Sequence, residues 1–135
     1  MTPPAVEYRV DAAFDAAALA DLFTRSGIRR PTGDLPRLAR MIAHANLTIT
    51  AWDGDALVGV ARALTDFSFC CYLSDLAVDR AYQRGGIGRE LVRRVQEAAG
   101  EEAMVLVLSA PETMAYYPKL GFDPVENAFQ LKRVR

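Results

Sequence analysis

Hydrophobic and polar residues follow two different periods along this chain, and the change of period marks the expected elements. Residues 6–10 alternate weakly and predict a first strand. Apolar residues then recur at helical spacing over residues 14–23, with Asp15 near the start and Gly27 after the end. A second helical pattern follows, which Asp34 or Pro36 can begin and which should end near residue 45 or 46.

The middle of the chain predicts a meander of antiparallel strands. Residues 47–52 and 56–64 flank Asp53, Gly54 and Asp55, and an Asp-Gly pair suits a hairpin turn with positive φ. A second turn is expected near residues 65–68, and it leads into a strand over residues 69–78.

The last part of the chain alternates between helical and extended patterns. An amphipathic helix is expected over residues 87–99, and the apolar run at 104–108 is typical of a strand buried on both faces. A short helix over residues 111–120 and one or two strands over residues 121–131 complete the prediction. This order predicts a mixed α/β fold in which helices pack on a central sheet.

Composition is consistent with one globular domain, residues 1–135. The chain of 135 residues is 51% hydrophobic and 24% charged, with a formal net charge of −1. A general nucleic-acid binder needs a concentrated basic surface, so this charge argues against that class. No apolar stretch approaches the length of a membrane span, and the first residues do not resemble a secretory signal.

Cysteine and histidine content predicts a reduced, cytoplasmic protein without a metal site. Cys70 and Cys71 are neighbours in a predicted strand, where their side chains point to opposite faces and cannot pair comfortably. The only histidine, His44, is remote from them in sequence, and no metal-ligand spacing is present.

A glycine-rich elbow carries the strongest chemical signal. It lies directly between the predicted strand that ends at Val78 and the predicted helix over residues 87–99, and it consists of Gln83, Arg84, Gly85, Gly86, Ile87 and Gly88. Glycines allow an anion to approach the backbone, and the first turn of a helix offers unpaired N–H donors and a positive dipole end. This placement indicates a cradle for a pyrophosphate, and the alternative is an ordinary strand-to-helix turn.

Two motifs give the chain a resemblance to a known family. Gln83, Gly86 and Gly88 fill the fixed positions of (Q/R)xxGx(G/A), which resembles the acetyl-CoA signature of the GNAT (Gcn5-related) N-acetyltransferases. Farther on, Tyr117, Gly121 and Phe122 look like the family's YxxxGF element. The resemblance implies a mostly antiparallel twisted sheet of roughly six to seven strands with about four flanking helices. It also implies an acyltransferase that uses acetyl-CoA and no metal.

The resemblance assigns roles to particular residues. Backbone groups of the elbow, with Arg84 and Arg89 at its rim, would hold the CoA pyrophosphate. The preceding strand would splay from its neighbour and leave main-chain groups free for the pantetheine amides, at Leu76, Ala77 and Val78.

Acetyl transfer to an amine needs two proton movements, and two side chains are candidates for them. Tyr117 occupies the position of the family's general acid, because a phenol with a pKa of about 10 keeps its proton at neutral pH and can give it to the departing thiolate. Asp75 is the candidate general base. The alternative for Asp75 is a hydrogen-bonding or capping carboxylate, and the alternative for Tyr117 is packing.

The acceptor is expected to be a primary amine on a small molecule or a peptide. Arg29 and Arg30, between the first two predicted helices, would favour an acceptor that also carries a carboxylate or phosphate if either points into the cleft. A second class of function is a CoA-binding sensor or interaction module without turnover. Edge strands near the C-terminus could pair between two subunits, which leaves a homodimer open.

Overall fold

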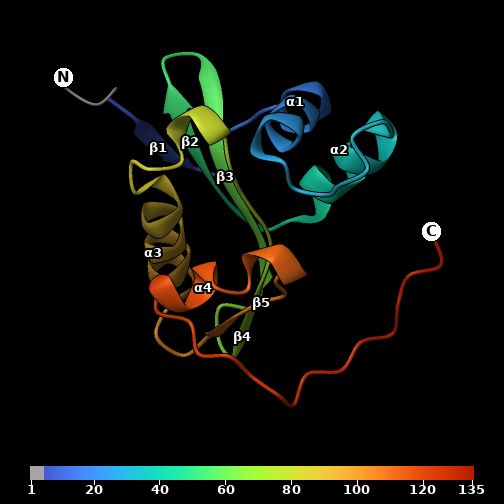
Figure 1. The fold of residues 1–135 in the computed structure, drawn as a ribbon, viewed down its shortest axis with the longest axis vertical. Coiled ribbons are helices and arrows are strands. Elements are labelled where there is room, and N and C mark those ends of the chain that lie inside the picture. Colours follow the sequence, from blue (N-terminus) through green and yellow to red (C-terminus); the bar gives the residue numbers. More distant parts are fainter. Residues whose placement is uncertain (1–4) are drawn as a thin grey trace.

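A five-stranded mixed sheet lies at the centre of the fold (Figure 1). The computed structural model describes residues 5–135. Four strands pair antiparallel in chain order, namely β1 (Glu7–Val10), β2 (Leu47–Asp53), β3 (Ala56–Thr65) and β4 (Cys70–Val78). The fifth, β5 (Met104–Val107), pairs parallel with β4. Gly54 forms the predicted turn between β2 and β3 with a φ of 59°.

Helices cover both faces of the sheet, as the sequence predicts. The helices α1 (Ala16–Ser26) and α2 (Leu35–His44) lie on one face, and α3 (Ile87–Ala99) lies on the other (Figure 1). Asp15 caps α1 by accepting a hydrogen bond of 2.8 Å from the Ala18 N–H, and Gly27 ends it with a φ of 85°. Asp34 caps α2 in the same way as Asp15 caps α1.

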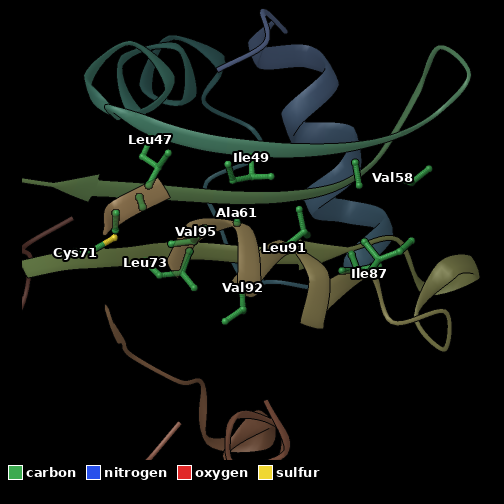
Figure 2. Packing of buried hydrophobic residues seen from close by; sticks show 14 residues of the cluster. Leu47, Ile49, Val58, Ala61, Cys71, Leu73, Ile87, Leu91, Val92 and Val95 are labelled. Carbon is green, nitrogen blue, oxygen red and sulfur yellow. The ribbon is translucent and has the colours of Figure 1, made fainter. Parts of the chain in front are cut away.

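The larger core cluster forms between α3 and the sheet. The buried stripe of α3 follows helical spacing and packs on side chains of β2, β3 and β4; Figure 2 labels Ile87, Leu91, Val92 and Val95 of this stripe. A Cβ on Gly59 of β3 would lie 3.1 Å from Ile87 and 3.2 Å from Leu91. The first turn of α3 therefore lies directly on the sheet, which fixes the position of the glycine elbow before it.

The C-terminal part differs from the sequence prediction in three respects. The expected helix over residues 111–120 is divided into η2 (Pro111–Thr113) and α4 (Tyr116–Lys119). The expected strands over residues 121–131 are absent from the described chain, and residues 123–135 are all exposed. β5 is an edge strand with Met104 58% exposed, so the prediction of burial on both faces was wrong.

The missing strands have a physical explanation. Residues with strand-like alternation form a strand only when a neighbouring edge accepts their hydrogen bonds. Residues 123–135 instead leave the body of the domain (Figure 1) and have no strand beside them among residues 5–135. The mixed α/β class is as predicted, and the sheet has five strands rather than six or seven. No helix within residues 5–135 combines the length and apolar character that crossing a membrane requires.

Candidate active site

The glycine elbow leads into the first turn of α3, and its residues 83–86 are exposed. Gly86 is the N-cap residue with a φ of 79°, in the left-handed region that favours glycine. Within residues 5–135 no side chain caps this helix, and no atom lies within 4 Å of the place that a Gly86 Cβ would occupy. The space beside Gly86, at the positive end of the α3 dipole, is therefore open to an anion, whereas Ile87 and Gly88 are buried.

Side chains around the elbow form hydrogen bonds with the neighbouring elements and leave the space beside Gly86 open. The Gln83 amide nitrogen donates a 3.0 Å hydrogen bond to the Val78 carbonyl, so it joins the elbow to the end of β4. Arg84 is exposed. Arg89 is also exposed and donates a 2.6 Å hydrogen bond to the Lys119 carbonyl, which ties α3 to α4. Both arginines are thus exposed beside the elbow.

The strand before the elbow has an open edge. β4 pairs with β5 only from Cys70 to Leu73, so residues 74–78 have no strand neighbour on that side within the described part of the chain, residues 5–135. The Asp79 N–H donates to the Val58 carbonyl of β3 at 2.9 Å, and main-chain groups alternate in direction along a strand. Leu76 and Val78 therefore direct their main-chain groups toward the open side, where the Val78 carbonyl accepts the hydrogen bond from Gln83, whereas Ala77 directs its groups toward β3.

Two tyrosines of α4 lie near this edge in different places. Tyr117 lines a cavity of about 480 Å³ beside β5, and its ring meets that of Phe122 edge-on at 5.5 Å. Burial raises the pKa of the Tyr117 phenol above its ordinary value. The Tyr116 hydroxyl lies at α3 instead, because a Cβ on Gly88 would be only 2.0 Å from it. Burial also raises the Tyr116 pKa, so both phenols hold their protons at neutral pH.

Asp75 is the centre of a buried charge cluster. Its side chain is fully buried, and one carboxylate oxygen accepts a 2.6 Å hydrogen bond from Arg30 while the other accepts one from Arg62. Arg30 also donates to the Ser74 carbonyl at 2.8 Å, and Arg62 donates to the Ser74 hydroxyl at 3.0 Å. Both oxygens of Asp75 are thus engaged with cations, which agrees with the hydrogen-bonding alternative for this residue.

The two arginines between α1 and α2 point in different directions. The Arg30 side chain is 27% exposed and is held against β4 by Asp75. The Arg29 side chain is 87% exposed, and its guanidinium lies 3.6 Å from the Glu112 carboxylate. This contact joins the loop after α1, in which acceptor selection was expected, to the segment after β5.

Comparison with known proteins identifies the family. The family model of the acetyltransferase (GNAT) domain matches residues 21–135. The chain belongs to the GNAT family. It is 25% identical over 118 residues to the uncharacterised N-acetyltransferase ycf52 of Porphyra purpurea, covering 78% of this chain and 65% of that protein. The chain spans between about a quarter and two thirds of the length of the curated relatives it matches.

Solved structures show the same fold. A GNAT family acetyltransferase from Streptococcus pneumoniae superimposes with a TM-score of 0.77 at 21% identity, covering 97% of this chain and 98% of that one. An aminoglycoside N-acetyltransferase solved with CoA gives a TM-score of 0.72 at 14% identity, covering 99% and 98%. The GNAT fold predicted from two motifs is therefore confirmed.

Sequence reasoning on this GNAT chain missed two participants. Arg62 is a single charge within the apolar run of β3, and it is only 6% exposed, so a charge in that setting signals a buried partner. Tyr116 was not predicted as a site residue, yet its hydroxyl lies beside Gly88. No pattern in the sequence reports that contact, since it depends on how α4 packs on α3.

Proposed function

We propose that this GNAT chain transfers an acetyl group from acetyl-CoA to a primary amine of a small molecule or peptide. The observation that carries the proposal is the uncapped elbow at the end of the open edge of β4. The main-chain N–H groups around Gly86 would bind the CoA pyrophosphate, and those of Leu76 and Val78 would bind the pantetheine amides. The open space beside Gly86 supports this, because an anion needs that room.

Acetyl-CoA supplies the thioester, and the chain supplies a proton. A neutral amine attacks the thioester carbonyl, so that a C–N bond forms and the C–S bond breaks. In this proposal the Tyr117 phenol donates its proton to the departing sulfur. Burial raises the pKa of this phenol, so the phenol is protonated at neutral pH and has a proton to donate. The proton lost by the nitrogen passes to water and returns to the phenolate through solvent, so the protons balance.

The general base was predicted to be Asp75, and we propose a different role for it. Both of its oxygens accept hydrogen bonds from guanidinium groups, which leaves no oxygen directed at an acceptor. Asp75 is therefore proposed to anchor the loop after α1 through Arg30, and the amine is proposed to lose its proton to water.

Acceptor selection is proposed to depend on Arg29. Its guanidinium is exposed and its single ion pair, with Glu112, is long, whereas Arg30 is committed to β4. An acceptor with a carboxylate or phosphate would gain a charge-assisted contact with Arg29. Thiol release from acetyl-CoA, measured over anionic and cationic amines, is expected to show an anionic preference that Arg29→Ala reduces. Equal selectivity in the wild type and Arg29→Ala would refute this part.

The decisive experiment compares two neighbouring tyrosines. Tyr117→Phe is expected to lower kcat roughly a hundredfold or more, because it removes the acid, while the CoA affinity measured by calorimetry stays nearly unchanged. Tyr116→Phe is the matched control: its hydroxyl lies at the elbow, so it is expected to alter CoA affinity and leave kcat nearly intact. CoA binding without turnover on any amine would favour a sensor module, and the absence of CoA binding would end both proposals.

Two coarser expectations accompany this function. We propose a cytoplasmic location, supported by two cysteines that are free in the structure. A homodimer is also proposed, in which edge strands near the C-terminus pair between two subunits.

A further inference from the structure

The last turn of α1 is joined to the segment that leads into the glycine elbow. Arg25, in this turn, donates a hydrogen bond to the Asp79 carboxylate and a second one, of 3.0 Å, to the Leu57 carbonyl of β3. Asp79 comes directly after β4, and its side chain is 12% exposed, whereas that of Arg25 is 37% exposed. A partly exposed guanidinium therefore compensates the charge of a buried carboxylate just before the elbow.

Asp79 also holds the turn between β4 and the elbow. Its other carboxylate oxygen accepts a 2.9 Å hydrogen bond from the Ala81 N–H and so caps the short 3₁₀ helix η1 (Arg80–Tyr82). The elbow begins directly after η1, and the Gly85 N–H donates a 3.4 Å hydrogen bond to the Tyr82 carbonyl. The position of the Asp79 carboxylate therefore determines that of η1, and η1 in turn determines where the elbow starts.

A second arginine joins the same two segments from the opposite direction. Arg80 is the first residue of η1, and a Cβ on Gly27 would lie 2.2 Å from its guanidinium nitrogen. The Arg80 side chain therefore lies against Gly27, the residue at which α1 ends. One guanidinium from α1 and one from η1 thus hold the end of α1 beside the turn that precedes the elbow.

The Tyr82 phenol shows that these charges act at η1. It donates a 2.5 Å hydrogen bond to Asp53, and this hydrogen bond raises the pKa of Tyr82. The charge of Asp79 raises the same pKa further, whereas the charge of Arg25 lowers it. Without Arg25, the charge of Asp79 would be uncompensated near Tyr82, the residue directly before the elbow, and a negative charge there opposes the binding of a pyrophosphate.

We propose that Arg25 is a positioning residue for the CoA site: through Asp79 it holds η1, and with it the glycine elbow, in the conformation that receives the pyrophosphate. This inference rests on the proposed acetyl transfer, because it concerns the same cradle. Arg25 acts through Asp79 rather than by contact with CoA. The helix α1, whose following loop is proposed to select the acceptor, thereby takes part in the CoA site as well.

Calorimetry with CoA measures this role. In Arg25→Met, which keeps an unbranched side chain and loses the charge, the Kd for CoA is expected to rise roughly tenfold, because a hydrogen bond between charged groups is lost. Arg25→Lys keeps the charge but cannot reach both Asp79 and the Leu57 carbonyl, so a smaller rise is expected. Arg9→Met is the matched control. Arg9 is also ion-paired, with Glu7, and its side chain is 40% exposed, but it lies on β1, so this substitution should leave the Kd unchanged.

A double-mutant cycle tests whether Arg25 acts through Asp79. Asp79→Ala removes both the partner of Arg25 and the cap of η1, so it should raise the Kd for CoA at least as much as Arg25→Met does. Adding Arg25→Met to Asp79→Ala should then change the Kd little, because the acceptor of the hydrogen bond is already gone. Full additivity of the two substitutions in the free energy of CoA binding would overturn the proposal.

The outcomes separate positioning from stability and from the proposed function. Circular dichroism checks that each variant is folded before titration, and a purely structural role for Arg25 would lower resistance to urea without changing the Kd for CoA. A folded Arg25→Met with the Kd of the wild type overturns the proposal, and so does an equal rise in Arg9→Met. Should Arg25→Met not fold, Arg25→Lys takes its place, and a Kd equal to that of the wild type has the same meaning. A wild type that does not bind CoA would instead refute the proposed function itself.

Discussion

Removal of the Asp75 charge should destabilise the fold strongly. In Asp75→Asn, the guanidinium of Arg62 loses its carboxylate partner while it stays 6% exposed. Breaking a buried ion pair by removing one partner costs about 3–5 kcal/mol, because a buried charge is left uncompensated. The loss of the Arg30 contact adds less to this cost, since the Arg30 side chain is 27% exposed and can reach water. The expected loss is therefore about 3–5 kcal/mol, a large part of a typical domain stability of about 5–15 kcal/mol.

Urea unfolding measures this loss, and an exposed ion pair provides the control. Glu112→Gln removes the partner of Arg29, where both side chains are more than half exposed, so its cost should stay below about 1 kcal/mol. Combining Asp75→Asn with Arg62→Met removes both buried charges of the close pair, and the double variant should lose less than the sum of the single variants. A loss for Asp75→Asn no greater than that for Glu112→Gln would refute the buried-cluster argument.

Three further predictions concern the elbow and the titrating groups. Gly86→Ala and Gly54→Ala both force alanine into a left-handed conformation at an open position and should each cost about 1–2 kcal/mol in unfolding, but only Gly86→Ala should also weaken CoA binding measured by calorimetry. Burial raises the Tyr117 pKa, so ionisation of this phenol should lower kcat only above about pH 10, and Tyr117→Phe should lack that alkaline decrease. Hydrogen bonds from the N–H groups of Cys70, Ser68 and Phe69 lower the Asp66 pKa to about 2. Because the folded-state pKa lies below the unfolded value, the stability that the Asp66 carboxylate contributes should disappear as pH falls from about 4 toward 2. Acid unfolding of Asp66→Asn should lack this dependence on pH.

The sequence predicted most accurately those features that depend on local chemistry. Asp15, Asp34 and Gly27 mark the helix ends because capping involves residues three or four apart. Gly54 and Gly86 adopt the positive φ that turn and elbow require. These features do not depend on tertiary contacts between elements, so they can be predicted from a single sequence.

Features that depend on distant contacts were predicted less well. The contact of Arg30 with Asp75 joins residues 45 positions apart, and no periodic pattern encodes it. The prediction of strands over residues 121–131 was wrong for a related reason. Strand-like alternation indicates a preference for extended backbone, but a strand also needs the edge of a neighbouring strand to pair with.

The geometry separates the two binding tasks of the proposed enzyme. The proposed CoA cradle would be built from main-chain groups of the elbow and β4, so it would depend on backbone conformation and little on charge. The acceptor side depends on a loop whose position is fixed by the contact of Arg30 with Asp75. An acidic acceptor that drew Arg30 away would leave Asp75 with a single cation in a buried place, which is unfavourable. Arg29 can turn from Glu112 to a substrate at little cost, because its ion pair is exposed. Of the two neighbouring arginines, the exposed Arg29 is therefore suited to recognise the acceptor, and Arg30 holds the loop in place.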